Sequence, residues 1–301
     1  MKDQFHTTLP SGRDIPLLTL GLIGIGTSGP IIAKSLIPVP SLIFLRNLIG
    51  GLVIIPLALS KGEWKSAEQR KALYWSALSG AFLAAHFLCF FGAMRLTSVA
   101  TGTAIAATQP IFAAIFVKFK GGHIPKRSIG GMVIAFLSVI LITGVDLNLS
   151  IRSFQGDLLA LIGGVFGAVY MLIGAKVQKN ISTSTFTSTC YLSCALVSFP
   201  VVILSDSKLF GFSSYDITLL IALIVGAQLL GHTMFNASLK RVSPVVVSLI
   251  VFFEVPVSAF FALIWLGQQP PVGTIPGIIG LLFGCGLFVV KSSQEIMDKN
   301  D

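Results

Sequence analysis

Residues 127–145 read RSIGGMVIAFLSVILITGV, and no side chain after Arg127 in this run is charged. A helix of about 20 apolar residues is long enough to cross the hydrocarbon core of a bilayer, which is roughly 30 Å thick. Lipid offers backbone groups no hydrogen-bond partners, so an apolar segment that crosses it must be helical. The run therefore predicts a membrane-spanning helix.

Similar apolar blocks fill the rest of the chain. Hydrophobic residues make up 54% of the sequence and charged residues 11%, and the mean hydropathy is +0.88. This composition leaves too little polar surface for a water-soluble domain. We therefore predict an all-α integral membrane protein with ten transmembrane helices, at residues 15–34, 39–59, 71–94, 98–119, 127–145, 155–177, 184–204, 216–238, 243–266 and 272–290.

Most basic residues lie in alternate connections between the predicted spans. The chain has 21 Lys and Arg against 12 Asp and Glu, and the basic residues outside this pattern are Lys34, Arg46, Arg95, Arg152 and Lys208. An excess of Lys and Arg in the loops of one side marks the cytoplasmic side. The pattern predicts a multi-pass protein of the cell (plasma or inner) membrane with both termini cytoplasmic. It argues against nucleic-acid binding, which gathers basic residues on one face.

The sequence carries an internal repeat. A shift of 146 residues aligns 86–144 with 232–290 without a gap and pairs His86 with His232 and Pro110 with Pro256. We predict two related halves, 15–145 and 155–290, between cytoplasmic tails at 1–14 and 291–301. Five spans per half is an odd number, so the second half must start from the opposite side of the membrane. Such inverted repeats are typical of secondary transporters.

Several motifs resemble the EamA branch of the drug/metabolite transporter superfamily. The first span contains Gly26-Thr27-Ser28-Gly29-Pro30 followed by Lys34, the second contains Phe44-Leu45-Arg46, and each half ends in an Arg-to-Pro segment, from Arg95 through Pro110 and from Arg241 through Glu254 and Pro256. The resemblance covers nearly the whole chain. It implies a ten-helix bundle that exports or exchanges small metabolites, commonly amino acids or related compounds, by alternating access.

The sequence departs from this family pattern at one place. Where the family often ends the ninth span with Leu-Gly-Glu, this chain has Leu266-Gly267-Gln268-Gln269. An acidic contact made by that glutamate is therefore absent here.

Three ionisable residues inside the spans are candidates for proton coupling and substrate binding. Glu254 is the only carboxylate predicted far from either interface, and His86 and His232 occupy equivalent positions in the two halves. An ionised group at the bilayer centre costs about 2.5–3.5 kcal/mol on insertion scales, so it usually faces a cavity or a partner. Histidine is suited to changing charge near physiological pH. Structural roles, as a satisfied carboxylate and as interhelical hydrogen-bond donors, stay open.

A polar stripe marks the eighth predicted span. Gln228, His232 and Asn236 follow one another at intervals of four residues, which places them on one face of an α-helix. A polar stripe on an otherwise apolar helix must face the protein interior. We interpret it as lining a cavity, with structural hydrogen bonding as the alternative.

Further polar residues complete the predicted substrate-binding set. Arg46 must reach the outer headgroups, pair with an acid or meet an anionic substrate, and reaching the headgroups is the simplest interpretation. Prolines remove backbone donors and can break the helices that carry the site. The other candidates are Thr27, Thr108, Gln109 and Tyr170, and the predicted helix breaks are at Pro30, Pro110 and Pro256.

No motif in the sequence predicts an enzyme. The sequence shows no His-Glu-x-x-His, no paired intramembrane aspartates and no nucleophile motif, and its four cysteines show no zinc-site spacing. We expect no catalytic residue, metal or cofactor. The expected partners are a small-molecule substrate, the lipid bilayer and a proton. A channel and an integral-membrane enzyme are the alternative functions.

Overall fold

The computed structural model describes residues 12, 14–119, 121, 128–238 and 251–297. In this part of the chain every regular element is a helix, which confirms the all-α prediction there. The elements are α1 (Asp14–Gly26), α2 (Ser28–Lys34), α3 (Val39–Lys61), α4 (Ala67–Ala93), α5 (Val99–Ala106), α6 (Gln109–Phe119), α7 (Ile129–Leu149), α8 (Ile151–Val177), α9 (Thr183–Leu204), α10 (Ser214–Ala222), the π-helix η3 (Leu223–His232), α11 (Thr233–Ser238), α13 (Glu254–Leu266), the 3₁₀ turn η4 (Val272–Thr274) and α14 (Ile275–Met297).

Serine caps set where many of these helices begin. A serine side chain directly before the helix accepts a hydrogen bond from a backbone N–H of the first turn, and Ser66 completes a capping box with Gln69. Because these caps lie outside the most apolar stretch, α4 and α8 start four residues earlier than the predicted spans. The capping serines are Ser66, Ser98, Ser150, Ser182 and Ser213.

Two of the predicted spans are interrupted. The first changes from α1 to α2 at Thr27, and the fourth changes from α5 to α6 across Ala107 and Thr108. Pro30 and Pro110 each lie in the first turn of the helix that follows the interruption. Pro256 lies in the first turn of α13, and the part of that predicted span before residue 251 lies outside the described residues.

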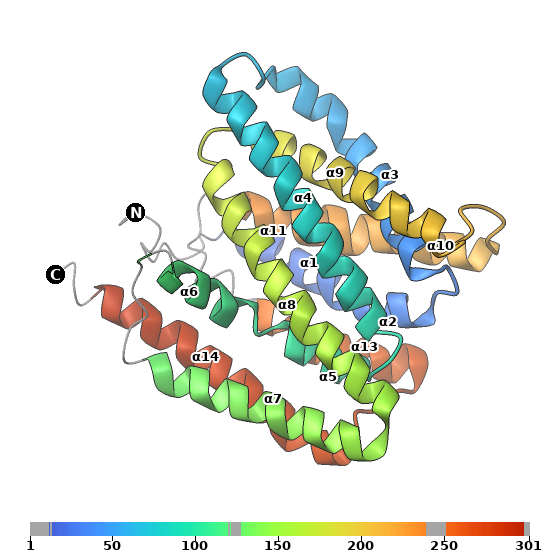
Figure 1. Cartoon of the computed structure of the whole chain (residues 1–301), viewed down its shortest axis with the longest axis vertical. Helices are drawn as coiled ribbons and strands as arrows, with labels where there is room; N and C mark the ends of the chain where they lie inside the picture. The colour runs from blue at the N-terminus through green and yellow to red at the C-terminus, as the bar shows by residue number, and fades with distance from the viewer. Residues whose placement is uncertain (1–11, 13, 120, 122–127, 239–250, 298–301) are drawn as a thin grey trace.

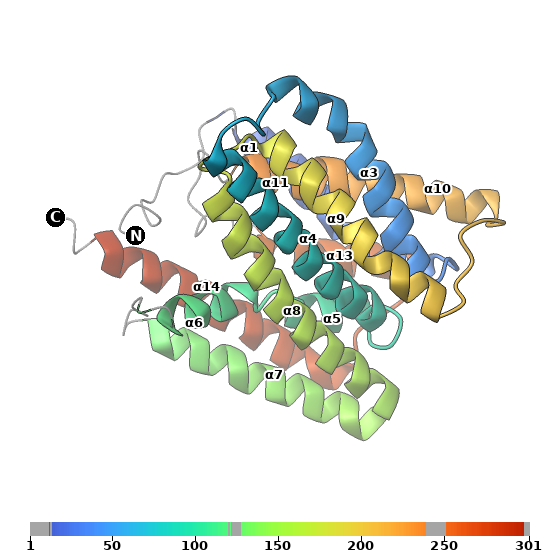
Figure 2. The same ribbon diagram turned by 45° about the horizontal axis from the view of Figure 1, so that its top comes forward.

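The helices pack mainly against helices of the other half of the chain. Helix α3 runs along α9, α4 lies between α9 and α8, and α7 runs along α14 (Figures 1 and 2). Helix α1 packs against the π-helix η3, and α5 packs against α13. The two halves are therefore interleaved rather than placed side by side.

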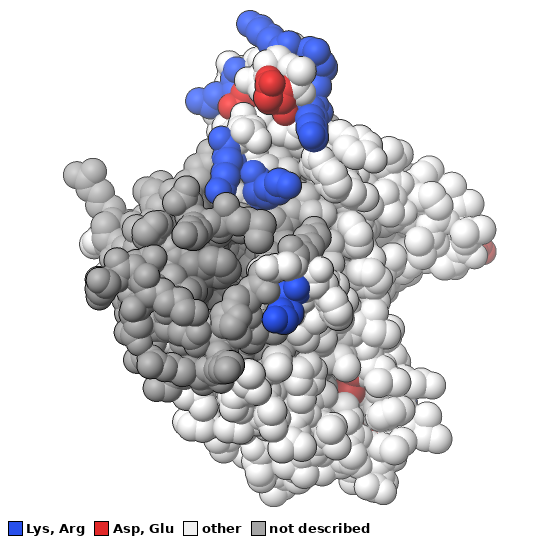
Figure 3. Space-filling model, turned by 60° about the vertical axis from the view of Figure 1, so that its left-hand side comes forward, with Lys and Arg blue, Asp and Glu red and all other residues white. Residues whose placement is uncertain are grey.

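Much of the outer surface is apolar. Large side chains on one flank of α7, among them Leu137 and Ile140, are more than half exposed. In the view of Figure 3, charged side chains are few and wide areas carry none. Among the described residues, eight helical segments are long and apolar enough to cross a membrane, and two shorter apolar helices cover Glu254–Leu266 and Val272–Phe288. An apolar belt of this kind suits contact with lipid rather than water.

Hydrogen bonds tie the two halves together at the end of the bundle remote from the end of α14 (Figure 1). The Lys34 ammonium donates to the Trp265 carbonyl at 2.9 Å, and the Leu36 N–H donates to the Asp216 carboxylate at 2.7 Å. The Gln268 side chain accepts from the Val99 N–H at 2.9 Å. The glutamine therefore caps the start of α5, although it replaces the glutamate of the family pattern.

Candidate functional site

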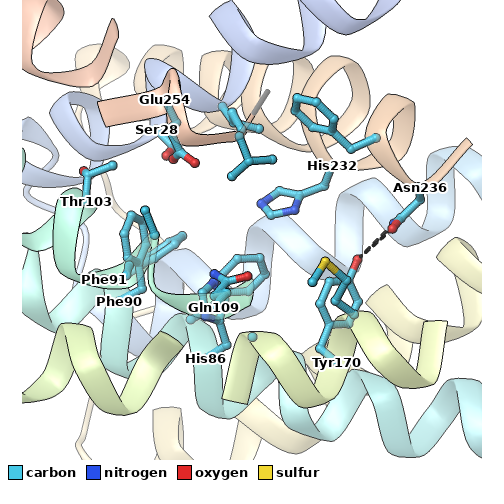
Figure 4. Close-up of a pocket in the computed structure, with 18 of the residues that line it drawn as sticks. Ser28, His86, Phe90, Phe91, Thr103, Gln109, Tyr170, His232, Asn236 and Glu254 are labelled. Carbon is cyan, nitrogen blue, oxygen red and sulfur yellow. Dashed lines mark hydrogen bonds between the residues drawn. The ribbon is translucent and has the colours of Figure 1, made fainter. Parts of the chain in front are cut away.

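A cavity lies between the helices of the two halves. Its volume is about 110 Å³. Figure 4 shows Glu254 and Ser28 on one wall, His86 and Gln109 opposite, and the Tyr170–Asn236 pair at one end. The first half contributes residues of α1 to α6, and the second half contributes residues of α8, η3, α11 and α13.

Arg46 is the most deeply buried charged residue of this cavity, with 1% of its surface exposed. Its guanidinium carbon lies 4.4 Å from the centroid of the Phe87 ring and 5.5 Å from that of Phe91, which is cation–π geometry. Nε donates to the Gln228 side chain at 3.2 Å, whereas Nη2 has no described protein partner. The interpretation that Arg46 reaches the outer headgroups is therefore wrong, because the side chain is enclosed by aromatic rings.

Tyr170 and Asn236 join the two helices at one end of the cavity. The Asn236 amide donates to the Tyr170 hydroxyl at 2.9 Å (Figure 4). The Tyr170 backbone carbonyl accepts from the hydroxyl of Ser79 on α4 at 3.1 Å. This pair fixes the distance between α8 and α11 while both side chains still line the cavity.

The two histidines have different surroundings. His86 Nδ1 lies 2.8 Å from the Gly163 carbonyl, and a carbonyl can only accept, so Nδ1 carries the proton. This leaves Nε2 as the ring atom free to bond a ligand. The His232 ring meets the Phe87 ring edge to face at 5.7 Å between centroids and has no hydrogen-bond partner among the described residues. His232 is therefore the freer polar group of the two.

Glu254 stands at the start of α13 with its carboxylate directed into the cavity (Figure 4). No hydrogen bond joins this carboxylate to any of the described residues. Nearby, the Thr103 and Ser258 hydroxyls lie 3.5 Å apart, which connects α5 to α13. The cavity thus contains a carboxylate and a guanidinium that do not form an ion pair with each other, which leaves both available to a ligand.

The π-helix changes the predicted polar stripe. The Thr233 N–H bonds to the Gln228 carbonyl five residues earlier, which widens the turn relative to an α-helix. His232 and Asn236 line the cavity, whereas Gln228 is fully buried beside Arg46 and Gly50. Gln228 therefore orients Arg46 and does not line the cavity. Wide π-turns of this kind occur frequently at functional sites.

The structure brings together seven of the ten residues predicted to bind substrate. Thr27 and Thr108 are not among the lining residues, because each hydroxyl bonds a carbonyl three residues earlier, in the helix that precedes it. The lining residues among the predicted set are Arg46, His86, Gln109, Tyr170, His232, Asn236 and Glu254.

Sequence reasoning did not identify the aromatic wall of the cavity. Phe87, Phe90 and Phe91 line it, and Ser28 and Thr103 add hydroxyls. The sequence holds 23 phenylalanines, so an aromatic residue alone gives no signal. The spacing of His86, Phe87, Phe90 and Phe91 along one face of α4 could have located the wall.

The fold and the cavity define a membrane protein whose helices enclose a polar site. The model of the EamA-like transporter family matches residues 15–144 and again residues 154–290, and the chain belongs to this family. The resemblance drawn from the sequence motifs is confirmed. The chain is thus a multi-pass membrane transporter.

Several known proteins are similar to this chain over most of its length. An uncharacterized transporter of Archaeoglobus fulgidus is 24% identical over 81% of this chain and 86% of its own. A pseudopaline exporter, CntI, of Pseudomonas aeruginosa is 21% identical over 84% of this chain and 87% of its own. One solved crystal structure superposes with a TM-score of 0.64 at 18% identity, covering 93% of this chain and 98% of that one. That likeness establishes the fold.

Proposed function

We propose that this chain is a secondary active transporter that moves a small polar metabolite bearing a carboxylate, such as an amino acid or a related compound, by alternating access. The observation that carries the proposal is the unpartnered Nη2 of Arg46 in a cavity that also holds Glu254. A buried donor without a partner costs about 1–3 kcal/mol, and more when it is charged. A ligand carboxylate that accepts from Arg46 removes this cost.

The packing between helices supports ten spans arranged as two inverted halves. In the predicted repeat, α3 corresponds to α9, α7 to α14 and α5 to α13. Each of these three pairs of equivalent helices is in contact, so exchanging the halves leaves the three contacts unchanged. In the same way, α4 corresponds to the span that contains η3, and α8 corresponds to the span that contains α1. The α4–α8 contact is therefore equivalent to the η3–α1 contact. Contacts of this symmetry are expected when two gates of similar construction open alternately around one site.

Export or exchange across the cell membrane is the direction that we propose. The relative named as a pseudopaline exporter supports efflux. The predicted bias of basic residues supports a cytoplasmic position for both termini. With the termini inside, the hydrogen-bonded end of the bundle that carries Lys34, Asp216 and Gln268 faces outward.

A ligand screen on the purified transporter tests the substrate class. Thermal unfolding is followed with amino acids, nucleobases and sugars. A ligand that binds the folded state increases the free energy of unfolding, by about 2.7 kcal/mol at 100 times its Kd, and therefore raises the melting temperature. We expect stabilisation by carboxylate-bearing compounds and a weaker effect of the matching amides. Arg46→Gln should remove that difference.

The control is Arg152→Gln, which changes a cation outside the cavity. Equal stabilisation by an acid and its amide in the wild-type protein would contradict the role assigned to Arg46. Stabilisation by sugars or nucleobases alone would contradict the proposed substrate class.

A further inference from the structure

Two aspartates meet at the junction between the halves, well away from the cavity lining. Asp146 lies near the end of α7 and Asp157 in the second turn of α8, and Ser150 alone separates the two helices. The two carboxyl groups lie within hydrogen-bonding reach of each other. The Thr97 hydroxyl, in the turn before α5, donates to Asp146 at 3.2 Å.

Both carboxyl groups are enclosed by protein. Asp157 is 0% exposed and Asp146 is 1% exposed. The Thr97 hydroxyl also interacts with Asp157, but no described group donates a hydrogen bond of standard geometry to either oxygen of Asp157, and one oxygen of Asp146 also lacks a donor. The backbone at Gly156 approaches Thr97 so closely that an added Cβ would lie 2.7 Å from the Thr97 nitrogen. The site is therefore tightly packed.

No positively charged side chain neutralises this pair among the described residues. The basic groups at this end include Lys34, Arg95 and Arg152, and Lys34 donates to the Trp265 carbonyl. Arg95 donates to the Ile37 carbonyl, and Arg152 donates to the Arg95 carbonyl. Helix α5 carries no ionisable residue, and neither does η4, which packs against α7. Two ionised carboxylates in contact repel each other, so they need a proton or another cation between them.

We propose that Asp146 and Asp157 form a proton-binding site that holds one proton between their carboxyl groups. Direct carboxyl–carboxyl contact favours a proton, because a metal ion between the oxygens would separate them. The pair then titrates as a unit. This site is distinct from the Glu254 cavity and does not depend on the proposed substrate.

Loss of the shared proton would leave two negative charges in contact inside the protein. The repulsion would push α7 away from α8, and Thr97 would move with Asp146, because an ionised carboxylate accepts more strongly from its hydroxyl. Thr97 stands two residues before α5, and α5 carries Thr103 into the cavity. The protonation state of the aspartate pair is in this way connected to the wall of the substrate cavity.

Infrared spectroscopy of the full-length protein in lipid bilayers tests the site. Glu254→Gln is used as the parent, so that the carboxyl group in the substrate cavity does not contribute to the signal. The parent should show the carbonyl stretch of about one protonated carboxyl per chain near neutral pH, and this signal should disappear in alkali. Asp157→Asn and Asp146→Asn should each abolish it, because an amide donates to the remaining carboxylate without a shared proton.

The matched control is Asp216→Asn, which removes a carboxylate at the same end that already accepts from a backbone N–H. This variant should keep the signal. A parent without the signal, or a signal that persists in Asp157→Asn, would overturn the proposal. A carboxylate spectrum that responds to Na⁺ or Ca²⁺ at constant pH would also overturn it and assign a metal cation instead. If the Asn variants do not fold, the titration of the parent decides.

Discussion

Arg46 illustrates how residue-scale interpretation changed with the structure. From the sequence, a cation part of the way into a span is most simply explained by contact with headgroups. The structure instead places two aromatic rings against the guanidinium and a glutamine on its Nε. Phe87 and Phe91 come from α4 and Gln228 from the π-helix, so no local pattern around Arg46 could predict this arrangement.

Glu254 carries the first residue-scale prediction. If its carboxylate takes up the coupling proton, Glu254→Gln should abolish pH-driven uptake into proteoliposomes while the melting temperature changes little, because an amide fills the same space without titrating. Uptake is measured with and without an imposed pH gradient. Glu68→Gln, at the exposed start of α4, is the control and should behave as wild type. Unchanged pH dependence in Glu254→Gln would rule out this coupling role.

Asn236 and His232 carry the second prediction. Both line the cavity, so Asn236→Ala and His232→Ala should weaken substrate binding by roughly tenfold, equivalent to about 1.4 kcal/mol. Their effect on unfolding should be smaller, because hydrogen bonds between membrane helices average about 0.6 kcal/mol. Ligand titration measures the loss of affinity, and thermal unfolding of the same samples measures the loss of stability. Asn148→Ala, whose amide bonds only the Gly144 carbonyl, is the control. A larger loss of stability than of affinity would favour the structural interpretation.

At the scale of elements, the sequence was most informative about the helices and least informative about their irregularities. Apolar block length predicted the eight long apolar segments of the described residues, because the bilayer sets that length. The π-helix at Leu223–His232, which packs against α1, has no comparable signal in the sequence. This is why the stripe spacing pointed to Gln228 as a cavity residue.

The contact between α7 and α14 yields an element-scale prediction with an internal control. A Cβ on Gly131 would lie 2.4 Å from the Phe288 backbone nitrogen, whereas a Cβ on Gly130 would meet nothing within 4 Å. Gly131→Ala should therefore lower the melting temperature markedly, because two helix backbones must separate. Gly130→Ala should be neutral or slightly stabilising, because alanine favours helix by about 1 kcal/mol. Thermal unfolding in one detergent compares the two, and equal melting temperatures would show that α7 and α14 do not pack this closely.

At the scale of the whole molecule, the division into two inverted halves stays a prediction, and the aspartate pair was not foreseen. Asp146 and Asp157 lie at span ends, where a sequence offers no reason to expect burial. Their contact depends on the tight turn at Ser150 and on the close approach of Gly156 to Thr97. Tertiary packing of this kind cannot be read from hydropathy.

Alternating access makes a prediction for the molecule as a whole. Substrate flux into proteoliposomes should saturate with concentration, and unlabelled substrate on the far side should accelerate the exit of labelled substrate, because one site serves both sides in turn. Counterflow experiments measure this directly. A flux that rises linearly with concentration, without acceleration by unlabelled substrate, would support the channel alternative.

Gln268 makes one hydrogen bond between the two halves independent of pH. A glutamate in its place would accept from the Val99 N–H as an anion, and acid would remove part of that attraction. The amide oxygen of glutamine is chemically the same at any pH in which the protein folds. The hydrogen bond between Val99 and Gln268 should therefore be equally strong in acid and at neutral pH.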